Sequence, residues 1–215
     1  MSDVKAVLFD FDMTLVDSSQ GIAYCTNAFA KLKGLRPVPY DTIMAAIGLP
    51  TKDSWEMYWG EFRQEWLEEY REKFRGEERR MMRLFPGTVP TLDALRGAGI
   101  KTGLVSNRQF ARSPAEYLGI ADKFDVIIGL EDVTRPKPDP EPLLTALSRL
   151  GVGPSAALYV GDTDIDMKTA VAAGVRGVGV TTGTFNAEQH AAAGAWRACA
   201  HIDEVPALCG GSQRK

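Results

Sequence analysis

Polar side chains follow several apolar segments of the chain, at or soon after the point where each segment ends. These residues are Asp10, Asp12, Ser106, Asn107, Lys137 and Asp162. A carboxylate can act as a nucleophile, and a second carboxylate two residues away can transfer protons to and from the reacting groups. A lysine and a hydroxyl can stabilise charge on the transferred group. If the fold brings these side chains together, they would suit a two-step group transfer through a covalent intermediate.

The acidic side chains would also require a cation. Carboxylates that share one crevice repel one another unless a positive charge lies among them. His190 and His201 lie outside these segments, so the ligands would be oxygen atoms, which favours a hard ion. Mg²⁺ is commonly bound by one or two carboxylates together with phosphate oxygens of a substrate. The residue types therefore predict a magnesium-dependent reaction of a phosphorylated compound.

Apolar segments alternate with amphipathic segments along most of the chain. Runs rich in Val, Ile and Leu occupy residues 4–9, 101–105, 124–128, 157–160 and 175–180. Apolar residues at helical spacing occupy residues 88–98, 113–118, 140–150 and 164–173. This alternation predicts an α/β fold with a three-layer, Rossmann-like parallel sheet. Ligands of such sheets bind beyond the carboxyl ends of the strands, so we expect the polar residues to converge at one edge.

Residues 19–84 break this alternation. Apolar residues keep helical spacing through most of the segment, and its aromatic residues fall on one helical face: Trp55, Trp59, Phe62, Trp66, Tyr70 and Phe74. Such a stripe usually packs into the core of a helical bundle. We therefore predict a Rossmann-like core of residues 1–18 and 85–215, with an all-helical segment inserted at residues 19–84.

The overall composition argues against several classes of partner. The chain has 25 basic and 28 acidic residues and a net charge of −3, without a basic stripe for nucleic acid. No apolar run approaches the ~20 residues that cross a bilayer, and the first residues do not resemble a secretory leader. We expect a cytoplasmic protein, monomeric or homodimeric, that binds a small phosphorylated metabolite. The three cysteines lack the spacing of zinc or redox sites and are expected to be buried or bystander thiols. The polar tail, residues 210–215, is expected to be disordered.

Four motifs resemble those of phosphatases in the haloacid dehalogenase (HAD) superfamily, and they occur in the family's order. Residues 10–15, Asp-Phe-Asp-Met-Thr-Leu, are similar to the first motif, Asp-x-Asp-x-Thr-Leu. Residues 105–107 resemble the second motif, residues 135–140 the third and residues 161–166 the fourth. The helical insertion follows the first-motif loop, where the family's first cap type belongs. Together the motifs span most of the chain.

The resemblance implies catalytic and metal-binding roles. Asp10 would be the nucleophile and a magnesium ligand. Asp12 would be the general acid and base, would lend its backbone carbonyl to the metal, and would be positioned with the help of Thr14. Asp162 would be a further metal ligand, and Asp166 would support the metal shell.

The resemblance also implies which residues hold the substrate. Ser106, Asn107 and Lys137 would bind the phosphoryl group, with Thr14 beside them. Lys137 would also neutralise Asp10, which places it among the catalytic residues. The cap would close over the site, exclude water during the reaction and reopen to release product.

The cap is expected to select the substrate. Residues 47–50, Ile-Gly-Leu-Pro, resemble the cap loop of the phosphoglycolate phosphatase-like branch, in which this loop faces the active site. Residues 202–206 resemble the end of those chains. Gly48, Leu49 and Pro50 are therefore candidate substrate-binding residues, and phosphoglycolate is the first candidate substrate. The composition of the loop alone fits a simple helix-breaking turn equally well.

Each motif taken alone also has an ordinary structural explanation. Asp-x-Asp pairs are common in surface turns, and Lys137 among prolines could be a solvated turn residue. Residues 161–166 could begin a helix with an N-cap and a first-turn acid, and Asp164 is assigned only this use. The joint occurrence at successive strand ends favours the catalytic interpretation.

Other activities of the same fold stay open. A sugar phosphomutase would also use Asp12 and a helical cap, although Ser106-Asn107-Arg108 looks more like the phosphatase form of the second motif. A phosphonate-cleaving enzyme would need a Schiff-base lysine in the cap, where Lys31, Lys33 and Lys52 are available.

Two further alternatives are less favoured. Dehalogenase chemistry has no leaving oxygen for Asp12 to protonate. A non-enzymatic binding or regulatory protein could also use this scaffold, because a fold does not determine function. The intact Asp10, Asp12, Lys137 and Asp162 argue against that class.

Overall fold

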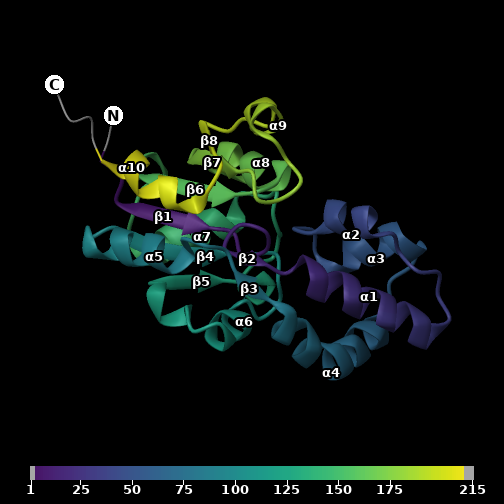
Figure 1. The fold of residues 1–215 in the computed structure, drawn as a ribbon. Coiled ribbons are helices and arrows are strands. Elements are labelled where there is room, and N and C mark those ends of the chain that lie inside the picture. The colour runs from purple at the N-terminus through teal and green to yellow at the C-terminus, as the bar shows by residue number, and fades with distance from the viewer. Residues whose placement is uncertain (1–2, 211–215) are drawn as a thin grey trace.

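A six-stranded sheet forms the centre of the larger body of the molecule in a computed structural model that describes residues 3–210 (Figure 1). Its order is β5-β4-β1-β6-β7-β8, and each neighbouring pair is parallel. The strands are β1 (Ala6–Phe9), β4 (Lys101–Val105), β5 (Val126–Ile128), β6 (Ala157–Gly161), β7 (Arg176–Val180) and β8 (Arg197–Cys199). This arrangement confirms the predicted α/β fold.

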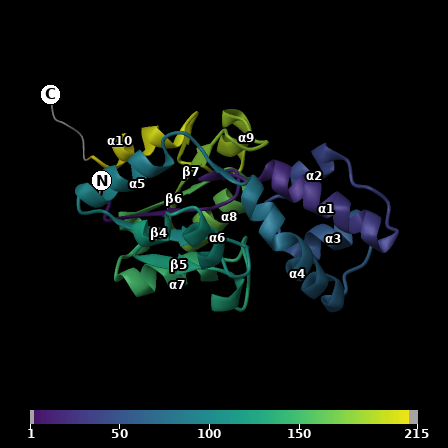
Figure 2. The same ribbon diagram turned by 60° about the horizontal axis from the view of Figure 1, so that its bottom comes forward.

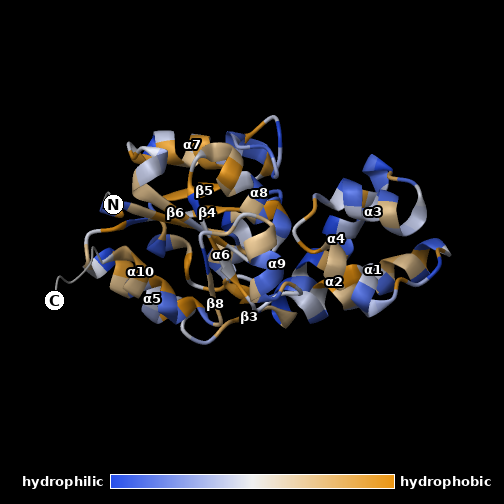
Figure 3. Cartoon of the chain, turned by 90° about the horizontal axis from the view of Figure 1, so that it is seen from above, coloured by the Kyte–Doolittle hydropathy of each residue, from blue (hydrophilic) through white to orange (hydrophobic). Residues whose placement is uncertain are grey.

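Helices cover both faces of the sheet, as Figure 3 shows from above. Because side chains alternate along a strand, β1 sends Val7 and Phe9 to one buried cluster and Ala6 and Leu8 to another. The first cluster contains residues of α5 (Thr88–Gly97), α6 (Arg112–Tyr117) and α10 (Val205–Cys209). The second contains residues of α7 (Glu141–Leu150) and α8 (Asp164–Ala173), and the short α9 (Ala187–Ala192) precedes β8. The three layers follow from a central strand that is apolar on both faces.

The inserted segment folds into helices that gather beyond one end of the strands (Figures 1 and 2). They are α1 (Ser19–Lys33), α2 (Tyr40–Ala46), α3 (Thr51–Trp59) and α4 (Gln64–Met81). The chain enters the insertion through β2 (Val16–Asp17) and leaves it through β3 (Arg83–Leu84), and these two short strands pair antiparallel. The insertion has a core of its own, in which Phe29 stacks on Trp55 with ring centroids 5.0 Å apart. The limits of the cap at residues 19 and 84 remain a prediction.

The aromatic stripe belongs to two helices rather than one continuous helix. Gly60 ends α3 with a φ of 78°, a left-handed conformation that favours glycine. The residues of the stripe still meet, because α3 and α4 pack around Phe29. The stripe is therefore the core of the bundle, as its composition predicts.

Three short strands of the fold were not predicted from the sequence. The edge strand β8 has two exposed residues out of three and no apolar run, and the paired strands β2 and β3 have two residues each. The cysteines Cys25, Cys199 and Cys209 are buried and form no disulfide, as expected from their spacing. Among residues 3–210, no helix is long and apolar enough to cross a membrane. Apart from Gly210, the tail expected to be disordered lies outside the described residues.

Candidate active site

A buried lysine joins two carboxylates at the end of β1. The Nζ atom of Lys137 donates to Asp10 and to Asp166, at 2.7 Å each, and to the hydroxyl of Tyr159 at 2.9 Å. Only 2% of the lysine surface is exposed. Although burial disfavours its charge, Asp10 and Asp166 raise the pKa of Lys137 above its ordinary value. Burial raises the pKa of Asp10 to about 7, against the opposing effect of Lys137. The lysine is thus held as a cation beside Asp10.

Three carboxylates form a candidate cation site. Oxygen atoms of Asp10, Asp162 and Asp166 all lie within 4.8 Å of one another, and all three side chains are buried. Burial, together with Asp166 and Asp10, raises the pKa of Asp162 well above its ordinary value. The side-chain donor recorded for Asp162 is the hydroxyl of Thr14, at 3.1 Å. This set of oxygen ligands lacks positive charge on the Asp162 side, so it fits a hard divalent cation.

Asp166 differs from the other two acids because both of its oxygens already have donors. One oxygen accepts from Lys137 and from Tyr159, at 2.7 and 2.8 Å. The other accepts from the backbone N–H and the hydroxyl of Thr163, at 3.1 and 2.7 Å, which completes the capping box of α8. Although burial acts to raise it, Lys137 lowers the pKa of Asp166. Such a carboxylate suits a supporting role next to a metal rather than sole ligation.

Asp12 is held by a network that reaches into the cap. Its oxygens accept from Ser18 at 2.5 Å and from two nitrogens of Arg108 at 2.6 and 2.7 Å. A third nitrogen of Arg108 donates to Glu78 of α4 at 2.7 Å, and Tyr70 donates to Glu78 at 3.0 Å. Although burial acts to lower it, Asp12 and Glu78 raise the pKa of Arg108. The cap is thus connected directly to Asp12.

The hydroxyl of Thr14 donates to Asp162 at 3.1 Å rather than to Asp12. A contribution of Thr14 to the position of Asp12 stays a prediction. The short loop after β1 turns back on itself, so that Asp12 bridges to Val16 and faces Ser18. Ser18 and Arg108 therefore position Asp12, and Thr14 positions Asp162.

Ser106 and Asn107 lie at the end of β4 beside the loop that carries Lys137, called the lysine loop below. The hydroxyl of Ser106 accepts from the backbone N–H of Arg108 at 3.1 Å. The amide of Asn107 accepts from the backbone N–H of Lys137 at 3.0 Å and donates to its carbonyl at 3.1 Å. It also donates to the carbonyl of Gly48 in the cap at 2.9 Å. Asn107 therefore fixes both the lysine loop and the cap loop.

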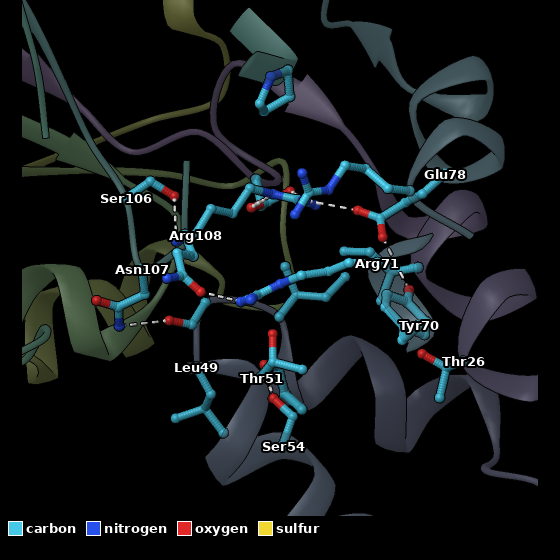
Figure 4. Close-up of a pocket in the computed structure, with 18 of the residues that line it drawn as sticks. Thr26, Leu49, Thr51, Ser54, Tyr70, Arg71, Glu78, Ser106, Asn107 and Arg108 are labelled. Atoms are coloured by element: carbon cyan, nitrogen blue, oxygen red, sulfur yellow. Dashed lines mark hydrogen bonds and ion pairs between the residues drawn. The ribbon is translucent and has the colours of Figure 1, made fainter. Parts of the chain in front are cut away.

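A cavity of about 150 Å³ lies between the core and the cap. Its lining includes Asp10 and Asp12 from the core, together with Ser106, Asn107 and Arg108. Figure 4 shows residues of both parts around it, with Arg108 linked to Glu78 and Asn107 linked to the cap loop. Residues of α1, α2, α3 and α4 form most of the rest of the wall.

The candidate cap residues lie at or near this cavity. Gly48 and Leu49 line it, whereas Pro50 immediately precedes α3 and is not in the lining. The cap lysines proposed for Schiff-base chemistry lie elsewhere. None of Lys31, Lys33 and Lys52 is among the described residues that line the cavity.

Sequence reasoning missed several residues that shape the site. Arg108 and Glu78 carried no motif signal that links them, and Tyr159 was one residue of an apolar strand. Gly183 was also missed. It has no side chain, and a Cβ atom at this position would lie 2.0 Å from an oxygen of Asp162. A glycine soon after the last apolar segment is a weak signal, since glycine is common in loops.

Comparison with known proteins places these observations in context. A family model described as haloacid dehalogenase-like hydrolase matches residues 7–180. The chain is 35% identical to an N-acetylmuramic acid 6-phosphate phosphatase of Pseudomonas aeruginosa, over 88% of this chain and 87% of that protein. It is 32% identical to a phosphoglycolate phosphatase of Aquifex aeolicus, over 80% of this chain and 83% of that protein.

Further similarity extends to a pyrophosphatase and to a solved structure. The Bacillus velezensis pyrophosphatase is 32% identical, over 82% of this chain and 83% of that protein. A Bacteroides fragilis structure described as a haloacid dehalogenase-like hydrolase superposes with a TM-score of 0.85 at 37% identity. The superposition covers 94% of this chain and 99% of that one.

Proposed function

Since the chain belongs to the haloacid dehalogenase-like hydrolases and is a phosphatase of that family, we propose that it works through an aspartyl-phosphate on Asp10. Its substrates are small phosphorylated metabolites, as for the relatives named above. The single observation that carries the proposal is the buried contact of Lys137 with Asp10, 2.7 Å long, beside Asp162 and under the cap.

In the first step, Asp10 attacks the phosphorus atom and the bond to the leaving oxygen breaks. Lys137 occupies one oxygen of Asp10, so the other is the oxygen that attacks. Asp12 gives a proton to the leaving oxygen, which departs as an alcohol. In the second step, water attacks phosphorus, Asp12 takes a proton from that water, and inorganic phosphate leaves Asp10 free again.

The remaining residues stabilise the phosphoryl group. Ser106, Asn107 and Lys137 would hold its oxygens, with Thr14 close to the acidic cluster. Mg²⁺ would be held by Asp10, Asp162 and the backbone carbonyl of Asp12, with support from Asp166, and would neutralise phosphoryl charge.

The cavity supports a small leaving group. Its volume of about 150 Å³ has room for several water molecules and therefore for a small organic group. Phosphoglycolate, the substrate named for the Aquifex aeolicus relative, is the first candidate. N-Acetylmuramic acid 6-phosphate and pyrophosphate, which the names of other relatives imply, are the alternatives. The two organic compounds contain a carboxylic acid besides the phosphate.

A phosphate-release screen with and without Mg²⁺ tests the proposal. The panel contains phosphoglycolate, pyrophosphate, N-acetylmuramic acid 6-phosphate, hexose phosphates and nucleotides. Analysis of the hexose products separates hydrolysis from a phosphomutase, which would move the phosphate without net release.

Asp10→Asn is the decisive variant. It should reduce turnover by at least about 10⁴-fold and prevent labelling of the protein by substrate phosphate, because the nucleophile is lost. Asp164→Asn makes the same chemical change at an acid that pairs with Lys168 outside the cavity, and it should retain activity. Full activity of Asp10→Asn would exclude the proposed nucleophile.

A further inference from the structure

The cavity wall supplied by α4 carries a row of arginines. Arg71, Arg75 and Arg79 recur at every fourth residue of this helix, and all three line the cavity. Residues four apart on a helix lie on the same face. In Figure 4, Arg71 extends from the cap towards the loop that carries Asn107 and Arg108. Three arginines of one helix therefore line the cavity.

The other basic residues of α4 are paired with acids of the same helix. Lys73 forms an ion pair with Glu69 at 2.8 Å, and Arg80 forms one with Glu77. Both lie on the part of the helix that does not line the cavity. The helix therefore has acidic partners for its outward-facing basic groups.

The arginines of the row lack such partners. Within residues 3–210, no ion pair with a carboxylate is recorded for any of the three, although each is half-buried. Arg108 also lines the cavity, but its charge is already used by Asp12 and Glu78. The contacts of the row are uncharged: Gln109 for Arg71, Ser113 for Arg79 and the ring of Phe110 for Arg75.

Positive charge on one helix face is unfavourable without an anion. Like charges four residues apart destabilise a helix. Burial first, and Arg75 second, lower the pKa values of both Arg71 and Arg79. Glu68 acts on Arg71 in the opposite direction, as Glu78 and Glu116 do on Arg79, but among residues 3–210 none of these acids forms an ion pair with the row. An anion in the cavity would therefore stabilise the three arginines.

We propose that Arg71, Arg75 and Arg79 bind a second anionic group of the substrate, carried by its leaving group. The inference rests on the proposed function and extends it, since it assigns the substrate class: small phosphate esters or anhydrides with a carboxylate or a second phosphoryl group. Guanidinium groups bind both kinds of anion through paired hydrogen bonds. The row binds the second anionic group while the phosphoryl group that is transferred lies at Asp10.

A purely structural role of the row makes a different prediction. If the arginines only hold the cap against the core through Gln109 and Ser113, their loss impairs every substrate to the same degree. If they bind the second anion, their loss impairs the anionic substrates selectively. The ratio of two specificity constants separates these roles, because cap closure cancels from it.

The experiment compares kcat/KM for matched substrates. Phosphoglycolate is paired with 2-hydroxyethyl phosphate, which replaces the carboxylate by a hydroxymethyl group, and pyrophosphate is paired with methyl phosphate. The proteins are the wild type, the triple variant Arg71→Gln/Arg75→Gln/Arg79→Gln, and Arg80→Gln as the matched control. The wild type should prefer the anionic member of a pair by about 10- to 100-fold, the value of a charged hydrogen bond or two.

In the triple variant, the ratio of the two kcat/KM values in that pair should fall to about 1, whereas Arg80→Gln should keep the wild-type ratio. The pair that shows the preference identifies the second anion as a carboxylate or a phosphoryl group. A wild-type ratio near unity in both pairs, or a preference that survives in the triple variant, overturns the inference.

A binding measurement separates this inference from the proposed function. Calorimetric titration of Asp10→Asn protein with phosphoglycolate and with 2-hydroxyethyl phosphate, in Mg²⁺, compares affinities without turnover. Tighter binding of phosphoglycolate that disappears on adding the triple substitution supports the row even if no ester is hydrolysed. Absence of phosphate release from every ester refutes the proposed function alone, and equal affinities refute the row alone.

Discussion

The core and the cap use charged side chains in opposite ways. In the core, Lys137 lies 2.7 Å from two carboxylates and is almost fully buried. In the cap, Arg71, Arg75 and Arg79 are half-buried and lack a carboxylate partner among residues 3–210. Charges that are fixed by the protein suit a reaction step that every substrate shares. Charges left without a carboxylate partner suit the part of the ligand that differs between substrates.

Two contacts connect the regions across this division. Arg108 joins Asp12 to Glu78, and Asn107 joins the loop of Lys137 to Gly48. Both core residues follow β4 directly. The position of the cap is therefore transmitted to the proposed proton donor and to the lysine loop.

The largest effect is expected from the paired charges of the core. Lys137→Met leaves Asp10 and Asp166 without their cation, and removal of one partner from a buried ion pair costs about 3–5 kcal/mol. Urea unfolding in EDTA should show that loss of stability, and phosphate release should fall about 10³-fold. Lys168→Met, at an exposed lysine that pairs with Asp164, should change stability by about 0.5 kcal/mol or less. An equal loss of stability and activity in Lys137→Met and Lys168→Met would show that the buried ion pairs of the core have no special role.

The next effect comes from the close approach of backbone to Asp162. Gly183→Ala places a methyl group 2.0 Å from the carboxylate, so the acid must move. We expect activity to fall about 100-fold and the Mg²⁺ concentration for half-maximal activity to rise about 10-fold. Gly153→Ala is the control, since no atom lies within 4 Å of its new methyl group. Unchanged Mg²⁺ dependence of Gly183→Ala would show that Asp162 is not a ligand.

A smaller effect is expected where the two regions meet. Glu78→Gln removes the negative charge with which Arg108 pairs in the cap, while the ion pair between Arg108 and Asp12 remains. Turnover should fall about 10-fold through loss of one charged hydrogen bond. Glu77→Gln breaks only the pair with Arg80 on the outward side and should leave kcat unchanged within about twofold. If kcat of Glu78→Gln equals that of the wild type, the cap does not act through Asp12.

The smallest effect concerns the interior of the cap. Gly60→Ala forces a side chain into the left-handed conformation at φ 78° and should destabilise the protein by about 1 kcal/mol. Gly76→Ala, within α4, should instead stabilise it by about 0.5–1 kcal/mol, because alanine favours a helix. Thermal unfolding measures both changes. A large loss of activity in Gly60→Ala would show that the bundle itself, and not only its cavity-facing residues, controls the reaction.

The sequence predicts those parts of the molecule that depend on local pattern. The strand at 101–105 and the helix at 164–173 agree with β4 and α8 because apolar periodicity and flanking turns determine both ends. The convergence of Asp10, Lys137 and Asp162 follows from parallel strands that end at one edge.

Features that depend on contacts between distant segments were not accessible in this way. Arg108 and Glu78 are 30 residues apart, and only the docking of α4 brings them together. Gly183 acquires its importance from a carboxylate that lies on another strand end. The edge strand β8 takes its conformation from pairing with β7 rather than from its own residues.

The paired strands β2 and β3 have one more consequence. Val16 lies opposite Leu84 and Asp17 opposite Arg83, so the chain leaves the sheet domain and returns to it at neighbouring points. Opposed residues of an antiparallel pair are only about 5 Å apart, a gap that a two-residue turn can close. The backbone connection alone would therefore accept a different segment between these strands, provided that the new segment replaces the contacts of Glu78 with Arg108 and of Gly48 with Asn107. The pair β2 and β3 is therefore the place at which a change of the inserted segment could change substrate specificity.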